Sequence, residues 1–281
     1  MDEQCFSGKM PDFPSKSDAI VVPSVPISAV AHPLPFPTAN FRLRTLCLIG
    51  ALLPGVGCYF CLFYTFLFQS DKIRNFTSTN CPDVVSRFPP VSYSIGVWQP
   101  QKTFWLFILF LHVPARLFFG IVYKSQFALG QSEYKSRSWY DKMVYVHVRL
   151  ILVEMLGLIA ISIFDIHDQF VLHALAYFVW IASFNFNMLF NTILHHHSGI
   201  RKLRKSLDPL FFFKCVLCYI IAYPLSVSTG FTYFIFLFTC NSLFYMLFSL
   251  AEYVVVGTNC LFYFLMIWEM NGCKLELYVK R

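Results

Sequence analysis

Residues 46–68 read LCLIGALLPGVGCYFCLFYTFLF, with no Asp, Glu, Lys, Arg or His among them. The hydrocarbon core of a bilayer takes about 20 residues of helix to cross, so this stretch is long enough to span it. Lipid offers no hydrogen-bond partner to exposed backbone groups, and a helix is the structure that satisfies those groups within one segment. The stretch therefore predicts a transmembrane helix and an integral membrane protein.

Five further apolar stretches follow, at residues 103–123, 143–164, 170–194, about 211–238 and about 242–270. The whole chain is 57% hydrophobic and 13% charged, whereas soluble domains are nearer half apolar and a quarter charged. We therefore predict an all-α polytopic membrane bundle of about six transmembrane helices within residues 41–275. Residues 211–270 also allow three shorter helices with turns near Gly230 and Glu252.

The ends of the chain differ from this membrane domain. Residues 1–40 are polar and contain seven prolines, and they lack the basic, apolar and small-residue order of a signal peptide. Such a composition favours an extended or disordered cytosolic tail. Residues 276–281 form a second, short cytosolic tail in this prediction.

The distribution of Lys and Arg predicts the orientation in the membrane. Fifteen of them lie in the N-terminal tail, the 124–142 and 195–208 loops and the C-terminus, and four lie in the 69–102 loop. Basic residues accumulate on the cytosolic side of membrane proteins, so both termini are predicted to be cytosolic. The 69–102 loop is then lumenal or extracellular, and it holds the glycosylation sequon Asn75-Phe76-Thr77.

The ten cysteines show no metal-ligand spacing, and we predict no metal site. Cys81 lies in the 69–102 loop and Cys240 lies in the short turn between the last two apolar stretches. Both would face an oxidising compartment, so we predict that they form a disulfide. Two free thiols at a helix end are the alternative.

Ionisable residues inside a membrane are costly, and each is a candidate for function. Arg116, Glu252 and Asn259 are the candidates for binding a substrate. The candidates for catalysis form a second set: His112, His173 and Glu154.

These candidates support two hypotheses. In the functional one, a polar cavity holds a lipid headgroup, Arg116 binds its phosphate, and His112 or His173 transfers protons. In the structural one, Arg116 pairs with Glu154 or Glu252, and Asn side chains bond the helices together.

Other polar residues near helix ends are expected to be structural. Arg149 and Lys214 lie near cytosolic ends, and their long side chains are predicted to reach for the interface. The run of three histidines at residues 195–197 is expected to cap a helix rather than bind a metal, because consecutive residues point in different directions around a helix.

Several of these residues lie in short sequence segments whose order along the chain resembles that of a known family. The segments are Cys81 followed by Pro90-Val91-Ser92-Tyr93-Ser94-Ile95-Gly96, Leu111-His112-Val113-Pro114-Ala115-Arg116, Glu154, His173 with Ile181-Ala182-Ser183, and Glu252-Tyr253-Val254-Val255-Val256-Gly257-Thr258-Asn259. Together they resemble the Frag, DRAM and Sfk family over residues 41–275.

The resemblance implies a role in maturing glycosylphosphatidylinositol (GPI) anchors, at the step that restores a saturated chain to a lyso intermediate. It implies a multi-pass protein of the Golgi membrane, with the endoplasmic reticulum as a second location. The implied partners are membrane lipids, GPI-anchored proteins and other membrane proteins of that pathway. The Lys and Arg residues cluster next to apolar runs, which argues against a nucleic-acid partner, and we predict no cofactor. The resemblance leaves open whether the chain is an acyltransferase or a necessary partner of one.

Two other functions remain open. A small-solute transporter or channel would fit six spans, but the sequence has no internal repeat and no paired broken helices. A non-catalytic membrane adaptor, like the autophagy-linked branch of the same family, is the second. The motifs of soluble enzymes, such as G-x-S-x-G and the P-loop, do not occur.

Overall fold

The computed structural model describes residues 39–271 and 273–277. Most of the predicted N-terminal tail and the last four residues lie outside the described residues. Within the described ranges six helices are long and apolar enough to cross a membrane: Leu43–Phe68, Gln101–Leu129, Ser138–Ile163, Phe170–His197, Lys205–Thr239 and Ser242–Glu269. The prediction of an all-α membrane bundle with about six transmembrane helices is confirmed.

Each crossing is built from one or more helices of the chain. The elements of the six crossings are α1 (Leu43–Cys47), α2 (Leu53–Phe68), α5 (Gln101–Leu129), α6 (Ser138–Ile163), α7 (Phe170–His197), α9 (Asp208–Cys215), α10 (Tyr223–Thr239), α11 (Ser242–Phe264) and α12 (Met266–Glu269). The shorter elements outside them are β1 (Ala39–Arg42), α3 (Ser70–Arg74), α4 (Val91–Gly96), α8 (Ile200–Leu203) and β2 (Lys274–Leu277).

Proline shapes the first and fifth crossings. A π-helical segment, Leu48–Leu52, precedes Pro54, and another, Val216–Ala222, precedes Pro224. Proline has no N–H and its ring clashes with the carbonyl four residues earlier. A wider turn just before the proline relieves that clash without ending the helix.

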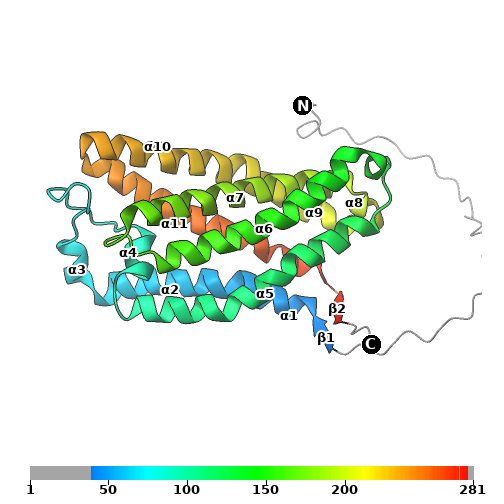
Figure 1. The fold of residues 1–281 in the computed structure, drawn as a ribbon, viewed down its shortest axis with the longest axis horizontal. Helices are drawn as coiled ribbons and strands as arrows, with labels where there is room; N and C mark the ends of the chain where they lie inside the picture. The colour runs from blue at the N-terminus through cyan, green and yellow to red at the C-terminus, as the bar shows by residue number, and fades with distance from the viewer. Residues whose placement is uncertain (1–38, 272, 278–281) are drawn as a thin grey trace, which may run out of the picture. The chain divides into compact units, whose positions relative to one another are not determined.

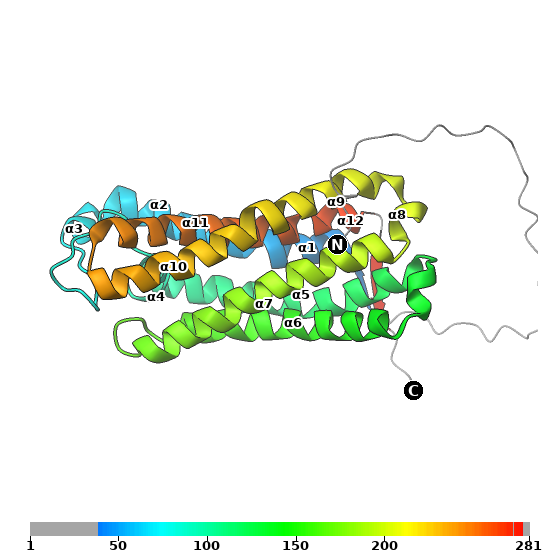
Figure 2. The same cartoon turned by 90° about the horizontal axis from the view of Figure 1, so that it is seen from above.

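The helices run side by side in pairs (Figures 1 and 2). α6 packs along α7, α10 along α11, and α2 against α5. Loops 69–100 and 164–169, together with the α10–α11 turn, lie at one end of the bundle, called here the disulfide end. β1, β2 and α8 lie at the other, called the ribbon end.

The ribbon end contains the two strands, which the sequence analysis did not predict. β1 pairs antiparallel with β2, with Asn40 opposite Glu276 and Arg42 opposite Lys274. Strands of four residues carry too little alternation of polar and apolar residues to be recognised in sequence. The pairing brings the residues just before the first helix and just after the last helix to the same end, as an even number of crossings requires.

The last 60 residues of the membrane domain form two crossings. Gly230 lies inside α10 and Glu252 lies inside α11, so the alternative of three shorter helices is wrong. The turn is made at Cys240, whose backbone is left-handed with φ 45°, and Asn241 caps α11 by accepting a hydrogen bond from the Leu243 amide at 2.9 Å. The cap satisfies one of the free amides that every helix start presents.

A disulfide joins Cys81 to Cys240 in the structure, with their Cα atoms 5.7 Å apart. It ties the long loop between α2 and α5 to the α10–α11 turn. Phe76, Tyr93 and Tyr245 pack together beside it. Asn75, the predicted glycosylation site, is exposed at this end.

We expect both termini to face the cytosol, because basic residues favour that side and six crossings return the chain to the side on which it began. Protease protection in sealed microsomes, with an epitope tag at each end, measures this. Both tags should be digested without detergent. Protection of the C-terminal tag alone would overturn the six-crossing topology.

We expect the Cys81–Cys240 bridge to form in the secretory pathway, where disulfides persist. Peptide mapping under non-reducing conditions should recover the two cysteines as one cross-linked peptide. Cys81→Ser and Cys240→Ser should each lose this cross-linked peptide. Each should also lower the free energy of unfolding by about 2–5 kcal/mol. Cys273→Ser is the control and should keep the cross-linked peptide. Free, alkylatable thiols at both positions would disprove the bridge.

Candidate functional site

Glu154 is the hub of a polar network in the middle of the membrane domain. Its side chain is fully buried on α6. Its Oε1 accepts a hydrogen bond from Asn259 Nδ2 at 2.7 Å, and its Oε2 accepts from Tyr263 Oη at 2.7 Å and Asn187 Nδ2 at 3.0 Å. A buried carboxylate is tolerated only when its charge and lone pairs are matched in this way.

Arg116 supplies the opposite charge from α5. Its Nη1 lies 3.7 Å from Glu154 Oε1, its Nη2 donates to Asn259 Oδ1 at 2.8 Å, and its guanidinium stacks over the Tyr263 ring at 4.3 Å. The side chain is 2% exposed. His112, one turn earlier on α5, is fully buried, and its Nδ1 bonds to the Ile108 carbonyl at 2.8 Å.

A second polar cluster lies nearer the disulfide end. Glu252, on α11, accepts a hydrogen bond through Oε2 from the Val91 amide at 2.8 Å, and so caps the start of α4. Its Oε1 is 3.4 Å from Ser92 Oγ. On the other side of Ser92, His173 Nε2 lies 2.9 Å from the same hydroxyl oxygen. We call Ser92, His173 and Glu252 the serine cluster.

The tautomer of His173 follows from its neighbours. Its Nδ1 lies 2.8 Å from the carbonyl oxygen of Phe164, which can only accept a hydrogen bond. Nδ1 therefore carries the proton, and in a neutral ring Nε2 presents its lone pair to Ser92. The serine hydroxyl is the donor in that contact.

The serine cluster forms part of the wall of a pocket of about 540 Å³. This pocket lies between α7 on one side and α10 and α11 on the other, with the start of α4 at its polar end. Nine aliphatic or phenylalanine side chains line the rest of the wall: Ile166, Phe170, Ala174, Phe178, Ile181, Val227, Phe231, Phe234 and Phe248. The uncharged polar residues Ser78, Thr79, Asn80, Ser226 and Thr229 line it as well. We call it the lateral pocket.

The outer rim of the lateral pocket faces the surroundings of the bundle. Phe178 on α7 and Val227 and Phe231 on α10 are 66%, 68% and 62% exposed. Gly230 lies between the latter two, and a Cβ built on it would meet no atom within 4 Å. These residues lie on helices long and apolar enough to cross a membrane, so this rim would face lipid in a bilayer.

A smaller cavity, of about 50 Å³, lies between the two polar groups and is lined by residues of both, including Arg116, Asn259, His173 and Glu252. This volume holds a few water molecules and no phosphorylated headgroup. Arg116 contacts Glu154 and Asn259 and lines only this small cavity, while His173 and Glu252 also line the lateral pocket.

Comparison with known proteins places the chain. The family model Frag1/DRAM/Sfk1/Cwh43P N-terminal domain matches residues 42–273, which is nearly all of the described structure. The chain belongs to the Frag1/DRAM/Sfk1/Cwh43P family.

Several known relatives align with most of this chain. It is 31% identical to Post-GPI attachment to proteins factor 2 of Drosophila pseudoobscura pseudoobscura, over 82% of this chain and 86% of the relative. It is 30% identical to the protein of that name from Drosophila melanogaster, over 84% and 89%. It is 24% identical to Acyltransferase PGAP2 of Xenopus tropicalis, over 85% and 91%. No solved structure matches.

The structure separates the residues that the sequence had grouped. Arg116, Glu154 and Asn259 lie in one network and Glu252 and His173 in another. Arg116 pairs with Glu154 rather than Glu252, whose partners are the amide and hydroxyl of α4. Binding of a phosphate by Arg116 remains a hypothesis. Ser92 lies in the segment Pro90–Gly96 that resembles the family, but it was not among the predicted site residues.

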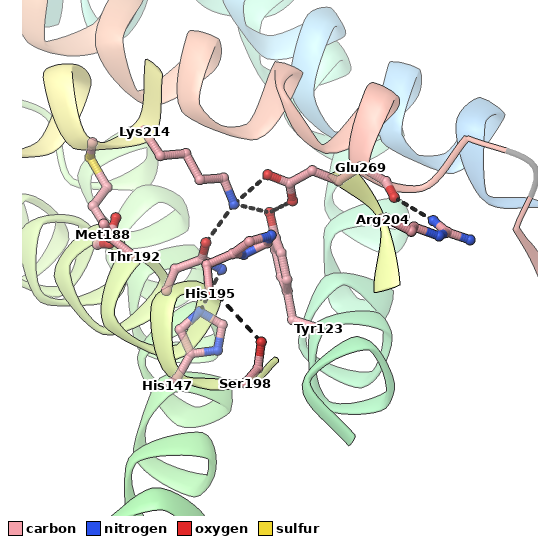
Figure 3. A network of polar contacts seen from close by, with 10 residues as sticks. Tyr123, His147, Met188, Thr192, His195, Ser198, Arg204, Lys214 and Glu269 are labelled. Atoms are coloured by element: carbon pink, nitrogen blue, oxygen red, sulfur yellow. Dashed lines mark hydrogen bonds and ion pairs between the residues drawn. The ribbon is translucent and has the colours of Figure 1, made fainter. Parts of the chain in front are cut away.

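A third polar network, around Lys214, was not predicted from the sequence. Lys214, expected to reach the interface, is fully buried: its Nζ lies 2.6 Å from Glu269 Oε1 and 2.6 Å from Asn191 Oδ1. Figure 3 shows Lys214 and Glu269 pointing toward one another, with Tyr123 beside them. Asn191 also bonds His147, at 3.1 Å. Lys214 and Glu269 are 55 residues apart, so no local sequence pattern predicted that they would pair. Arg149, by contrast, is exposed.

We expect Arg116→Ala to destabilise the protein by about 3–5 kcal/mol, because it leaves Glu154 charged and unpaired in the interior. Arg116→Lys keeps the charge but makes fewer hydrogen bonds, so its loss should be smaller. Thermal unfolding in detergent measures both, with Arg149→Ala, an exposed arginine, as the control.

The same variants separate the two hypotheses for Arg116. If the residue is an ion-pair member, Arg116→Lys should retain surface display of GPI-anchored proteins in a null background. A variant that folds like the wild type yet loses display would instead support binding of phosphate.

Proposed function

We propose that this chain acts in the lipid remodelling of GPI anchors during their maturation and supports stable surface display of GPI-anchored proteins. Relatives of this chain over more than four fifths of its length bear the name Post-GPI attachment to proteins factor 2. The Xenopus relative is named an acyltransferase. We extend acyl transfer to this chain, with the lateral pocket as its site.

The observation that carries the proposal is the composition of the lateral pocket. Its lining along α7 and α10 is mainly apolar, with Ser226 and Thr229 on α10 as uncharged polar exceptions. The histidine and the carboxylate that line it both belong to the serine cluster, near the disulfide end. A hydrocarbon chain with an ester or hydroxyl at one end has the same distribution. The volume of about 540 Å³ lies within the range of about 300–1,000 Å³ that small-molecule sites occupy.

The predicted site residues take different roles in this proposal. His173 contacts the reacting end of the lipid, and Glu252, which also lines the lateral pocket, holds the start of α4 in place beside it. Arg116, Glu154 and Asn259 hold α5, α6 and α11 in position from within the bundle. His112 lies beside Arg116 on α5 and does not line the lateral pocket.

The proposal includes a location. The disulfide end faces the lumen of the Golgi or the endoplasmic reticulum, with Asn75 as a glycosylation site. A glycan-bearing anchor lies on that side of the membrane, and the serine cluster lies near that end of the bundle. Partners are then the anchored proteins, membrane lipids and other membrane proteins of the remodelling pathway.

Filling the lateral pocket tests its role. Gly230→Leu places a side chain at the pocket wall, and the Cβ of that side chain would meet no atom within 4 Å. We expect this variant to fold normally and to reduce restoration of the saturated anchor chain at least about tenfold, since the side chain competes with the acyl chain for space. Mass spectrometry of anchor lipids from null cells re-expressing the variant measures this.

Ser228→Leu is the matched control, because Ser228 is an exposed small residue two positions away on α10 that does not line the pocket. It should remodel anchors like the wild type. Equal activity of the Gly230 and Ser228 variants would show that the pocket is not the acyl site. Unchanged anchor lipids in the null cells, with an altered flux of a small solute, would favour a transporter instead.

A further inference from the structure

Ser92 has the surroundings of a nucleophile. It is the second residue of α4 and is 7% exposed, and it lines the lateral pocket. Its hydroxyl points at His173 Nε2 over 2.9 Å, within the range in which a histidine can remove the proton of a serine.

His173 is held in the orientation that this proton transfer needs. The Phe164 carbonyl fixes the proton on Nδ1, as derived above, and so keeps the Nε2 lone pair aimed at Ser92. In serine enzymes a third group oriented on the far ring nitrogen has the same effect. A backbone carbonyl takes that place here.

Glu252 fixes the position of Ser92 from the other side. Its bond to the Val91 amide anchors the first turn of α4, and its Oε1 lies 3.4 Å from Ser92 Oγ. Ser92 has one proton and two acceptors within reach, Glu252 Oε1 at 3.4 Å and His173 Nε2 at 2.9 Å, and the shorter contact favours His173. Glu252 then acts on Ser92 mainly through the backbone of α4. We therefore class Glu252 as a positioning residue.

A neighbour on the same helix shows that these contacts are particular to Ser92. Ser94 is fully buried on α4, its hydroxyl has no hydrogen-bond partner among the described residues, and it does not line the lateral pocket. Tyr177 also lines the lateral pocket, and its hydroxyl is buried without a hydrogen-bond partner among the described residues.

We propose that Ser92 is the nucleophile that carries the acyl group in this pocket as a serine ester, with His173 as its general base. The proposal rests on the acyl transfer proposed above and names its mechanism. The acyl donor is a compound with an activated acyl carbonyl, either a fatty-acyl thioester or the ester of a diacyl phospholipid.

The two half-reactions balance. Ser92 Oγ attacks the acyl carbonyl and its proton passes to His173 Nε2. The bond from the carbonyl carbon to sulfur or oxygen of the donor breaks, and the leaving thiol or alcohol takes that proton. A hydroxyl of the lyso lipid then attacks the serine ester and gives its proton to Nε2. The bond to Oγ breaks, and Ser92 regains a proton from His173.

Trapping the serine ester tests the proposal. The full chain in detergent, with no lyso lipid present, is incubated with an alkyne-tagged palmitoyl thioester in one arm and an alkyne-tagged phosphatidylcholine in the other. We expect label on the peptide that contains Ser92, in the arm that holds the true donor. The label should resist neutral hydroxylamine, as an oxygen ester does. Peptide mass spectrometry separates it from acylated cysteines.

Four variants sharpen the result. Ser92→Ala and His173→Gln should lose the label on this peptide. Ser94→Ala should keep it, as the matched control on the same helix. Ser92→Cys should take up label that neutral hydroxylamine removes, because a thioester replaces the ester. Size-exclusion profiles and thermal unfolding show that each variant is folded.

A cellular arm separates this proposal from the proposed function. In null cells, Ser92→Ala should reduce restoration of the saturated chain at least about 100-fold, and Ser94→Ala should restore it. If wild type restores the chain but shows no label in either arm, or if Ser92→Ala restores it fully, Ser92 is not the nucleophile and the proposed function stands. If the null cells have normal anchors, the proposed function itself fails.

Discussion

One buried carboxylate determines how the membrane helices meet. Glu154 lies where neither water nor headgroups can compensate its charge, so its partners have to come from neighbouring helices. They come from α5, α7 and α11, through Arg116, Asn187, and Asn259 with Tyr263. Apolar side chains facing lipid give little preference for one rotation of a helix over another. Hydrogen bonds to a shared carboxylate do, because each donor reaches it in one rotation only.

The lateral pocket is a consequence of which helices this network includes. Asn187 ties α7 to α6 and α11, whereas α10 packs along α11 and does not reach Glu154. α7 and α10 are joined by the hydrogen bond from Asn185 Nδ2 to Ser226 Oγ at 2.9 Å, and the lateral pocket extends between the two helices from there toward the disulfide end. His173 lies on the same helix as Asn187, about four turns nearer that end. The network in the middle of the bundle thus sets the position of the histidine at the polar end of the pocket.

The membrane crossings could be predicted from the sequence, but only part of the candidate site could. Runs of about 20 apolar residues are strong signals, and the charges within them marked Arg116, Glu154 and Glu252 as unusual. The sequence did not show which residues these charged side chains contact. Glu252 bonds to a backbone amide of α4, a six-residue helix outside the membrane runs that has no periodicity to reveal it.

The other failures have the same origin. Lys214 was placed at an interface because it lies near the end of an apolar run, but its depth depends on Glu269, which approaches from the last crossing. Ser92 carries no charge, so the cost of burial did not single it out. Its chemistry comes from His173, 81 residues later in the chain. Distances of this kind follow from packing, which local pattern does not specify. The order of the partners along the chain also constrains biogenesis: Glu154 enters the membrane with Arg116 already synthesised, but Asn259 follows only 105 residues later. Until then the nascent protein has an ion pair without its amide bridge, so the buried network at Glu154 is completed only when the final helix is in place.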